Sequence, residues 1–213
     1  MAPEVKKRLE DAFSKFSEYI HSVGYKGKSG PISVDIRSEM PTGAIAYYDS
    51  QKRMLVIDSK HADDLTNLYR EYMHHVLYIN GVPEDPKLKF LAYYGIETGL
   101  AWYFPCSFVD DPHPSANGWN LDQKRSFDEI RQDITSAMTD GTEVWGGVFW
   151  DLRKLLGGKT SDPLLFKAWS DYELKPEDVA TDRGASFARK LIEADGKHRN
   201  EIKALFDQRG LKL

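Results

Sequence analysis

Hydrophobic residues near the start of the chain recur at steps of three and four. Between residues 3 and 23 these positions are Val5, Leu9, Phe13, Phe16, Tyr19 and Ile20. This spacing follows the 3.6-residue turn of an α-helix that buries one face. The stretch 24–31 contains three glycines and a proline and interrupts the pattern. We therefore predict an amphipathic helix over residues 3–23.

The pattern then changes to short segments typical of strands. Residues 32–38 alternate between apolar and polar side chains, and 44–50 and 53–59 are further β-type runs next to turn residues. Alternation places successive side chains on opposite faces of a strand. These segments predict a small sheet of about three strands, at least partly a meander.

From residue 61 onward the spacing is mainly helical. The segment 61–81 has acidic residues in its first turn and a glycine at its end, which favours a helix. A second helix is predicted over 87–104, before Pro105, followed by a loop over 105–122. Helical patterns continue at 126–138, 143–157, 161–172, 184–195 and 198–208. The prediction is a single α+β domain over 1–213, with the helix and sheet in 1–60 and the helical part in 61–213.

The composition is that of an ordinary globular protein. The chain has 213 residues, of which 41% are hydrophobic and 29% charged, and its net charge of −4 is spread widely, so no nucleic-acid binding is expected. We find neither a signal peptide nor the ~18 unbroken apolar residues of a membrane span, and expect a soluble protein. The single cysteine, Cys106, excludes an internal disulfide and predicts a small buried side chain. Compartment, oligomeric state and the extent of the full protein stay open.

Residues 68–78, LYREYMHHVLY, contain an altered zinc-binding pattern. In H-E-x-x-H, two histidines on one helix face bind zinc and the glutamate is the general base. Here Glu71 and His74 stand at the glutamate and second-histidine positions, whereas Arg70 occupies the position of the first histidine.

Two further patterns follow in order, TGLAWYF at 98–104 and GTEVWGGVFWDLRKLLG at 141–157. Together with the altered motif, they resemble the gluzincin (thermolysin-like) branch of zinc metallopeptidases over roughly residues 44–157. The resemblance implies a zincin-like fold, with a glutamate on the second helix as the third zinc ligand. In that register Thr98 stands at the glutamate position and Trp102 at the position of a supporting aspartate. The resemblance also implies structural roles, an ion pair or a cap, for Asp151 and Arg153.

These replacements remove ligands that catalytic zinc requires. Such a metal usually has three protein ligands and one open position for water. Arginine has no lone pair to donate, and a threonine hydroxyl is a poor substitute for a carboxylate. With His74 alone as a ligand we expect no metal cofactor. Glu71 then occupies a vestigial general-base position, because no metal activates a water for it.

Arg70 offers a fixed positive charge in place of the dication. Because neighbours on a helix do not face each other, we expect Arg70 to pair with Glu97 on the second helix, or with another carboxylate, rather than with Glu71. The predicted function is that of a zincin-like pseudopeptidase that binds a peptide or protein. The expected binding residues are Arg70, His74, Glu97, Thr98 and Trp102. Nearby aromatic residues either line a cleft for this ligand or belong to the core: Tyr69, Tyr72, Tyr93, Tyr94, Trp102, Trp145 and Trp150.

An active metallopeptidase is the alternative. His75 and Glu97 neighbour His74 and Thr98, so His74, His75 and Glu97 form a shifted set of possible zinc ligands. A shift of one residue rotates a helical side chain by ~100° and would turn Glu97 away from the site unless the helix itself has slid. A third reading, a metal-free hydrolase with Glu71 and His74 as an acid–base pair, lacks a recognisable nucleophile motif.

Overall fold

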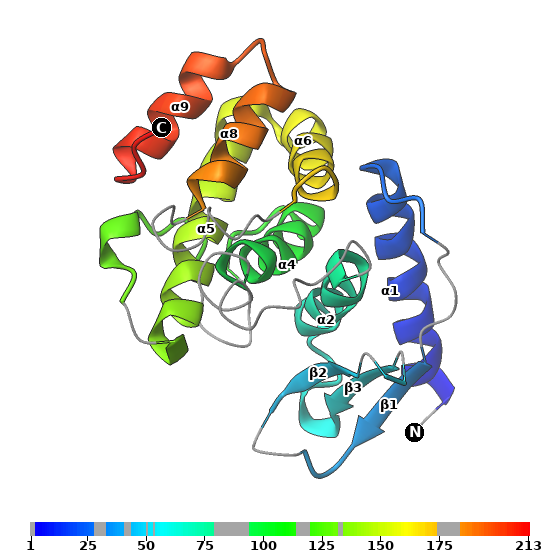
Figure 1. Ribbon diagram of the computed structural model, residues 1–213. Coiled ribbons are helices and arrows are strands. Elements are labelled where there is room, and N and C mark those ends of the chain that lie inside the picture. The colour runs from blue at the N-terminus through cyan, green and yellow to red at the C-terminus, as the bar shows by residue number, and fades with distance from the viewer. Residues whose placement is uncertain are drawn as a thin grey trace.

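The computed structural model describes residues 3–27, 33–40, 44–49, 51–52, 54–78, 94–113, 120–131, 134–173 and 184–213. This part of the chain is mostly helical and contains a three-stranded mixed sheet, which confirms the α+β class (Figure 1). The strands are β1 (Ser33–Arg37), β2 (Ala46–Asp49) and β3 (Met54–Asp58). The helices are α1 (Pro3–Ser22), α2 (Leu65–Tyr78), α4 (Tyr94–Val109), α5 (Ile134–Leu156), α6 (Gly158–Ser170), α8 (Ala185–Ala194) and α9 (Arg199–Gln208), with single 3-10 turns at η2 (Ser59–His61) and η4 (Phe127–Glu129).

The sheet has the strand order β1-β3-β2. Strands β2 and β3 are antiparallel, as expected for a meander, whereas β1 pairs with β3 in parallel. The alternating positions that pack on the hydrophobic core are Val34, Ile36, Ala46, Tyr48, Leu55 and Ile57. The period-two pattern thus sets which face is buried, and β1 departs from a simple meander.

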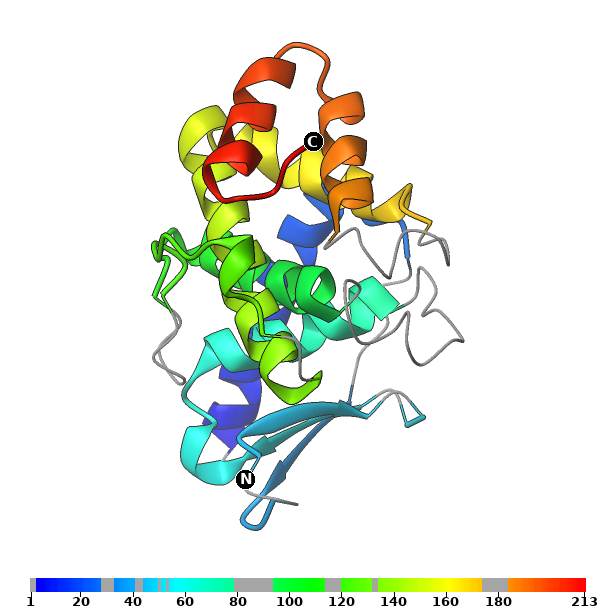
Figure 2. The same ribbon diagram turned by 60° about the vertical axis from the view of Figure 1, so that its left-hand side comes forward.

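Helix α4 is the central helix of the molecule. Its side chains are apolar on every side, which is typical of a helix buried all round. It lies between α2 and α5, while α6, α8 and α9 lie at the end away from the sheet (Figures 1 and 2). Helix α1 packs beside α2, through a stacked pair of rings from Phe16 and Tyr69. The pair α2 and α4 is the one that carries the altered zinc motif.

Two predicted boundaries are wrong. Helix α4 does not end before Pro105 but continues through it to Val109. A proline inside a helix removes one backbone hydrogen bond, and here its neighbours on α4 are all buried, so packing holds the helix together. The segments 126–138 and 143–157 are also not separate helices, because α5 runs unbroken from Ile134 to Leu156.

The glycines in these helices permit close packing. A Cβ atom at Gly99 of α4 would come within 2.9 Å of Trp145 Cβ and 3.1 Å of the Gly146 nitrogen of α5. A Cβ atom at Gly95 would lie 3.2 Å from Gly141 Cα. The glycines thus bring α4 against α5 and fix the rotation of α4, on which the direction of Glu97 depends.

The motif helix begins later than predicted. Helix α2 covers Leu65–Tyr78, preceded by the 3-10 turn at Ser59–His61, whereas residues 79–93 lie outside the described part of the chain. Among the described helices, none combines the length and the apolar character needed to cross a membrane.

Candidate functional site

Helix α2 begins at an acidic cap. One carboxylate oxygen of Asp64 accepts the backbone N–H of Thr66 at 3.1 Å and that of Asn67 at 3.4 Å. These bonds satisfy N–H groups that have no partner within the helix, as an N-cap residue does. The cap fixes where α2 starts, and with it the directions in which the motif side chains point.

Helices α2 and α4 meet at His74 and Glu97. His74 Nδ1 donates to Glu97 Oε1 at 2.7 Å, and Thr98 Oγ1 donates to the other oxygen of Glu97 at 3.3 Å. The Glu97 side chain is only 1% exposed and that of His74 13%. Glu97 therefore points toward the motif helix, although the ~100° rotation between neighbouring helix positions predicted that it would turn away from the site. Glu97 and Thr98 both lie at the contact, but Glu97 is the one that bonds to His74.

Arg70 does not make the expected pair. Its Nη1 donates to Glu71 Oε1 at 2.6 Å, and Glu97 instead accepts from His74. Neighbouring residues on a helix usually do not face each other, but the arginine side chain is long enough to reach the carboxylate of the next residue. The guanidinium still reaches α4, where its Cζ lies 5.1 Å from the centre of the Trp102 ring, a cation–π contact.

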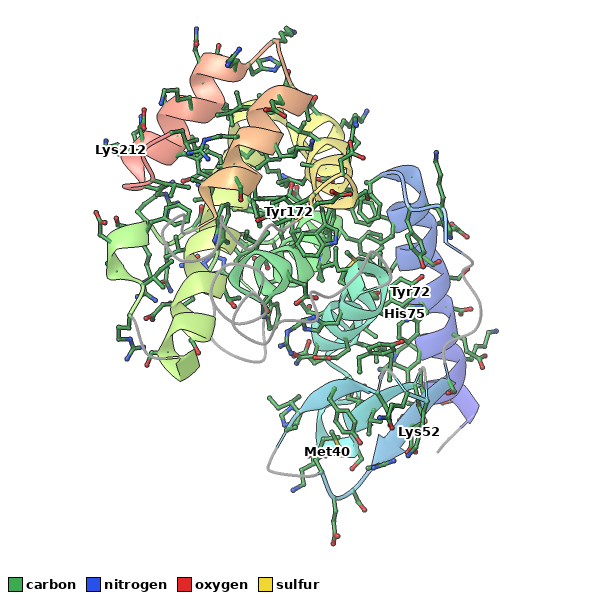
Figure 3. The ribbon with its side chains drawn as sticks, in the orientation of Figure 1. Met40, Lys52, Tyr72, His75, Tyr172 and Lys212 are labelled. Atoms are coloured by element: carbon green, nitrogen blue, oxygen red, sulfur yellow. The ribbon has the colours of Figure 1, made fainter. Side chains whose placement is uncertain are left out.

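His75 points in another direction from His74. Its Nδ1 lies 2.5 Å from the hydroxyl of Tyr48 on β2, and its ring contacts that of Tyr72. Figure 3 shows Tyr72 and His75 on the side of α2 that faces α1 and the sheet. His74 and His75 thus join α2 to different neighbours, α4 and β2. Tyr48 was not singled out from the sequence, although the alternation of its strand predicts an inward side chain.

Among the described residues, the candidate ligands do not converge as a catalytic zinc ion requires. Within the described segments, no group of three His, Cys, Asp or Glu side chains converges as metal ligands. His74 and Glu97 meet, but the third member of the shifted set, His75, lies against Tyr48. The position before Glu71 holds a guanidinium, which cannot coordinate a metal.

Each buried carboxylate of the site has a basic partner. The side chain of Glu71 is 5% exposed and contacts Arg70, and Glu97 contacts His74. An unpaired buried carboxylate is strongly unfavourable, so these contacts are what allow both glutamates to remain buried.

The aromatic residues near the motifs belong to the core where the structure describes them. Each of the following side chains is at most 5% exposed: Tyr69, Tyr72, Trp102, Trp145 and Trp150. The side chains of Tyr93 and Tyr94 lie outside the described part. The sequence left open whether these aromatic residues line a cleft or belong to the core, and these five belong to the core.

The structural roles expected for Asp151 and Arg153 are confirmed. Asp151 forms ion pairs with Arg209, Lys124 and Lys154. Arg153 forms an ion pair with Asp110 at 2.9 Å and donates to Ser107 Oγ at 2.9 Å. Cys106 is buried as predicted, and burial raises the pKa of its thiol to about 12.

A second buried polar cluster was not found from the sequence. Asp162 of α6 accepts hydrogen bonds from Tyr19 of α1 at 2.8 Å, from Tyr103 of α4 and from Ser107 of α4 at 2.9 Å. Burial and the negative charge of Asp162 raise the pKa of Tyr103. The cluster ties three helices together around one carboxylate, and no local motif marks these residues.

Comparison of the chain with protein-family models, curated proteins and solved structures finds no match. The likeness to gluzincins therefore depends on the three sequence motifs alone and stays a prediction.

Proposed function

We propose that this protein is a zincin-like domain without catalytic zinc, a pseudopeptidase that binds a peptide or protein. The observation that carries the proposal is the contact between His74 and Glu97 at 2.7 Å, next to the Arg70–Glu71 pair at 2.6 Å. Arg70 and Glu71 form one acid–base pair, and His74 and Glu97 form the other. The helices thus stay together by protein contacts where a metallopeptidase would use a metal.

Strand β2 supports the peptide-binding half of the proposal. Within the described residues it pairs only with β3, so its other edge offers backbone hydrogen-bonding groups. An extended peptide can add to such an edge as a further strand. The contact between Tyr48 and His75 fixes this strand against the motif helix.

Metal content tests the proposal against an active metallopeptidase that uses His74, His75 and Glu97. The protein is purified without chelators, and bound metals are measured by elemental mass spectrometry. We expect less than a tenth of an equivalent of zinc, as a rough threshold, because only two of the three ligands converge. About one equivalent of zinc, removable by EDTA together with a peptidase activity, would establish the alternative.

A gain of zinc by substitution tests the geometry. In Arg70→His, the new imidazole lies one helical turn before His74, on the face that contacts α4, and Glu97 already points at this face. We expect this single change to create a His-His-Glu site with roughly stoichiometric zinc. The control is Arg70→Gln, which should bind none. If only Arg70→His combined with Thr98→Glu binds zinc, Thr98 rather than Glu97 holds the ligand position.

A further inference from the structure

Arg70 has hydrogen-bonding capacity that the protein does not use. A guanidinium carries donors on all three of its nitrogens. In the described residues Arg70 donates one hydrogen bond, from Nη1 to Glu71, and its buried Nε has no acceptor. Nε itself is buried and out of a ligand's reach, so the donors that a ligand can use are those on the exposed part of the guanidinium.

The guanidinium is also held in place. Its carbon lies 5.1 Å from the ring centre of the buried Trp102, and one edge bonds to Glu71. The side chain is 23% exposed, so part of it remains accessible. A donor that is fixed before binding loses little conformational freedom when a ligand arrives.

The surrounding charges select the kind of acceptor. Glu71 and Glu97 are both buried beside Arg70 and His74, so the site already holds as many acidic as basic side chains. A ligand carboxylate would add a further negative charge close to the two glutamates and would be repelled. A carbonyl oxygen of an amide accepts the same N–H groups without adding a charge.

We infer that Arg70 binds a backbone carbonyl oxygen of a peptide through its unused N–H groups. The inference rests on the proposed peptide-binding function and names the anchor for it. Arg70 then has two roles: Nη1 holds Glu71 of its own helix, and the remaining N–H groups on the exposed part of the guanidinium bind the ligand.

The probe is a peptide selected on the full chain from a random library of acetylated, amidated peptides. Its affinity is measured by calorimetry for Glu71→Gln and for the double variant Arg70→Met, Glu71→Gln, so that no buried carboxylate is left unpaired. We expect Glu71→Gln to bind at least as tightly as the unmodified chain, because Arg70 gains a free donor. The double variant should bind at least about tenfold more weakly than Glu71→Gln, the effect of one hydrogen bond to a charged group.

Two comparisons make the outcome decisive. Arg199→Met, at an exposed position of α9, is the matched control and should leave affinity unchanged. The NMR signal of the Arg70 Nε–H group should shift with the peptide and not with sodium acetate. Equal affinity of Glu71→Gln and the double variant, or a response to acetate alone, overturns the role of Arg70 while peptide binding stands. If the library yields no binder, the proposed peptide-binding function is wrong as well.

Discussion

At the scale of single residues, the site shows how two buried glutamates are each held against a basic side chain. Glu71 and Glu97 keep their places because Arg70 and His74 contact them directly. Glu71 pairs with its neighbour on the same helix, whereas Glu97 pairs with a residue of the other motif helix. A sequence can predict that such carboxylates need a cation, but which cation pairs with which glutamate depends on side-chain conformation.

The pairing of Arg70 with Glu71 predicts a specific set of stabilities. Arg70→Met leaves the buried Glu71 carboxylate without its cation and should cost on the order of 2 kcal/mol, less than for a fully buried pair because Arg70 is partly exposed. Adding Glu71→Gln removes the unpaired charge and should restore at least half of this loss. Urea unfolding at pH 7 measures both variants. Identical unfolding midpoints for the single and double variants would show that the unpaired Glu71 carboxylate carries no penalty.

At the scale of elements, hydrophobic spacing predicts most helices and strands within a few residues. It predicts α1, β1, β2 and β3 closely because each buries one regular face. It fails where a helix is apolar all round, since α4 has no polar face to mark its rotation or its end. The direction of Glu97 is set by the packing of α4 on α5, which no local pattern contains.

The close contact between α4 and α5 predicts a penalty for a methyl group at Gly99. Gly99→Ala places a Cβ atom 2.9 Å from Trp145 Cβ and should destabilise the protein by roughly 1–3 kcal/mol, since two packed helices must separate. The matched control is Gly196→Ala, where a Cβ atom would meet nothing within 4 Å. Thermal unfolding compares the two. A Gly99→Ala protein as stable as the control would mean that α4 and α5 do not pack this closely.

At the scale of the whole molecule, contacts between distant segments complete the fold. Asp162 joins α1, α4 and α6, and the buried Arg209 donates to the backbone oxygens of Gln123 and Arg125 and contacts Asp151 of α5. These residues are far apart in sequence and carry no motif. They were not predicted because a polar side chain looks the same in sequence whether it is buried or exposed.

Asp140 links such contacts to the response of the molecule to acid. Its carboxylate, 3% exposed, accepts from Arg131 Nε at 2.8 Å and from Arg125 Nη1 at 3.2 Å. The hydrogen bonds from Arg131, with further help from Arg125, lower the pKa of Asp140 to about 2 although burial opposes the shift. Because the folded pKa lies below the unfolded value of about 3.9, the ionised carboxylate stabilises the folded state.

This contribution is complete at neutral pH and is lost as the pH falls from about 4 through about 2. Asp140→Asn should therefore lower the free energy of unfolding by about 2 kcal/mol at pH 7, and the gap to the unmodified protein should shrink steadily toward pH 2.5. Urea unfolding across this range measures the gap, with Asp11→Asn at an exposed position of α1 as a control that should show no gap. A gap of constant size at every pH would mean that Asp140 acts through packing and not through its charge.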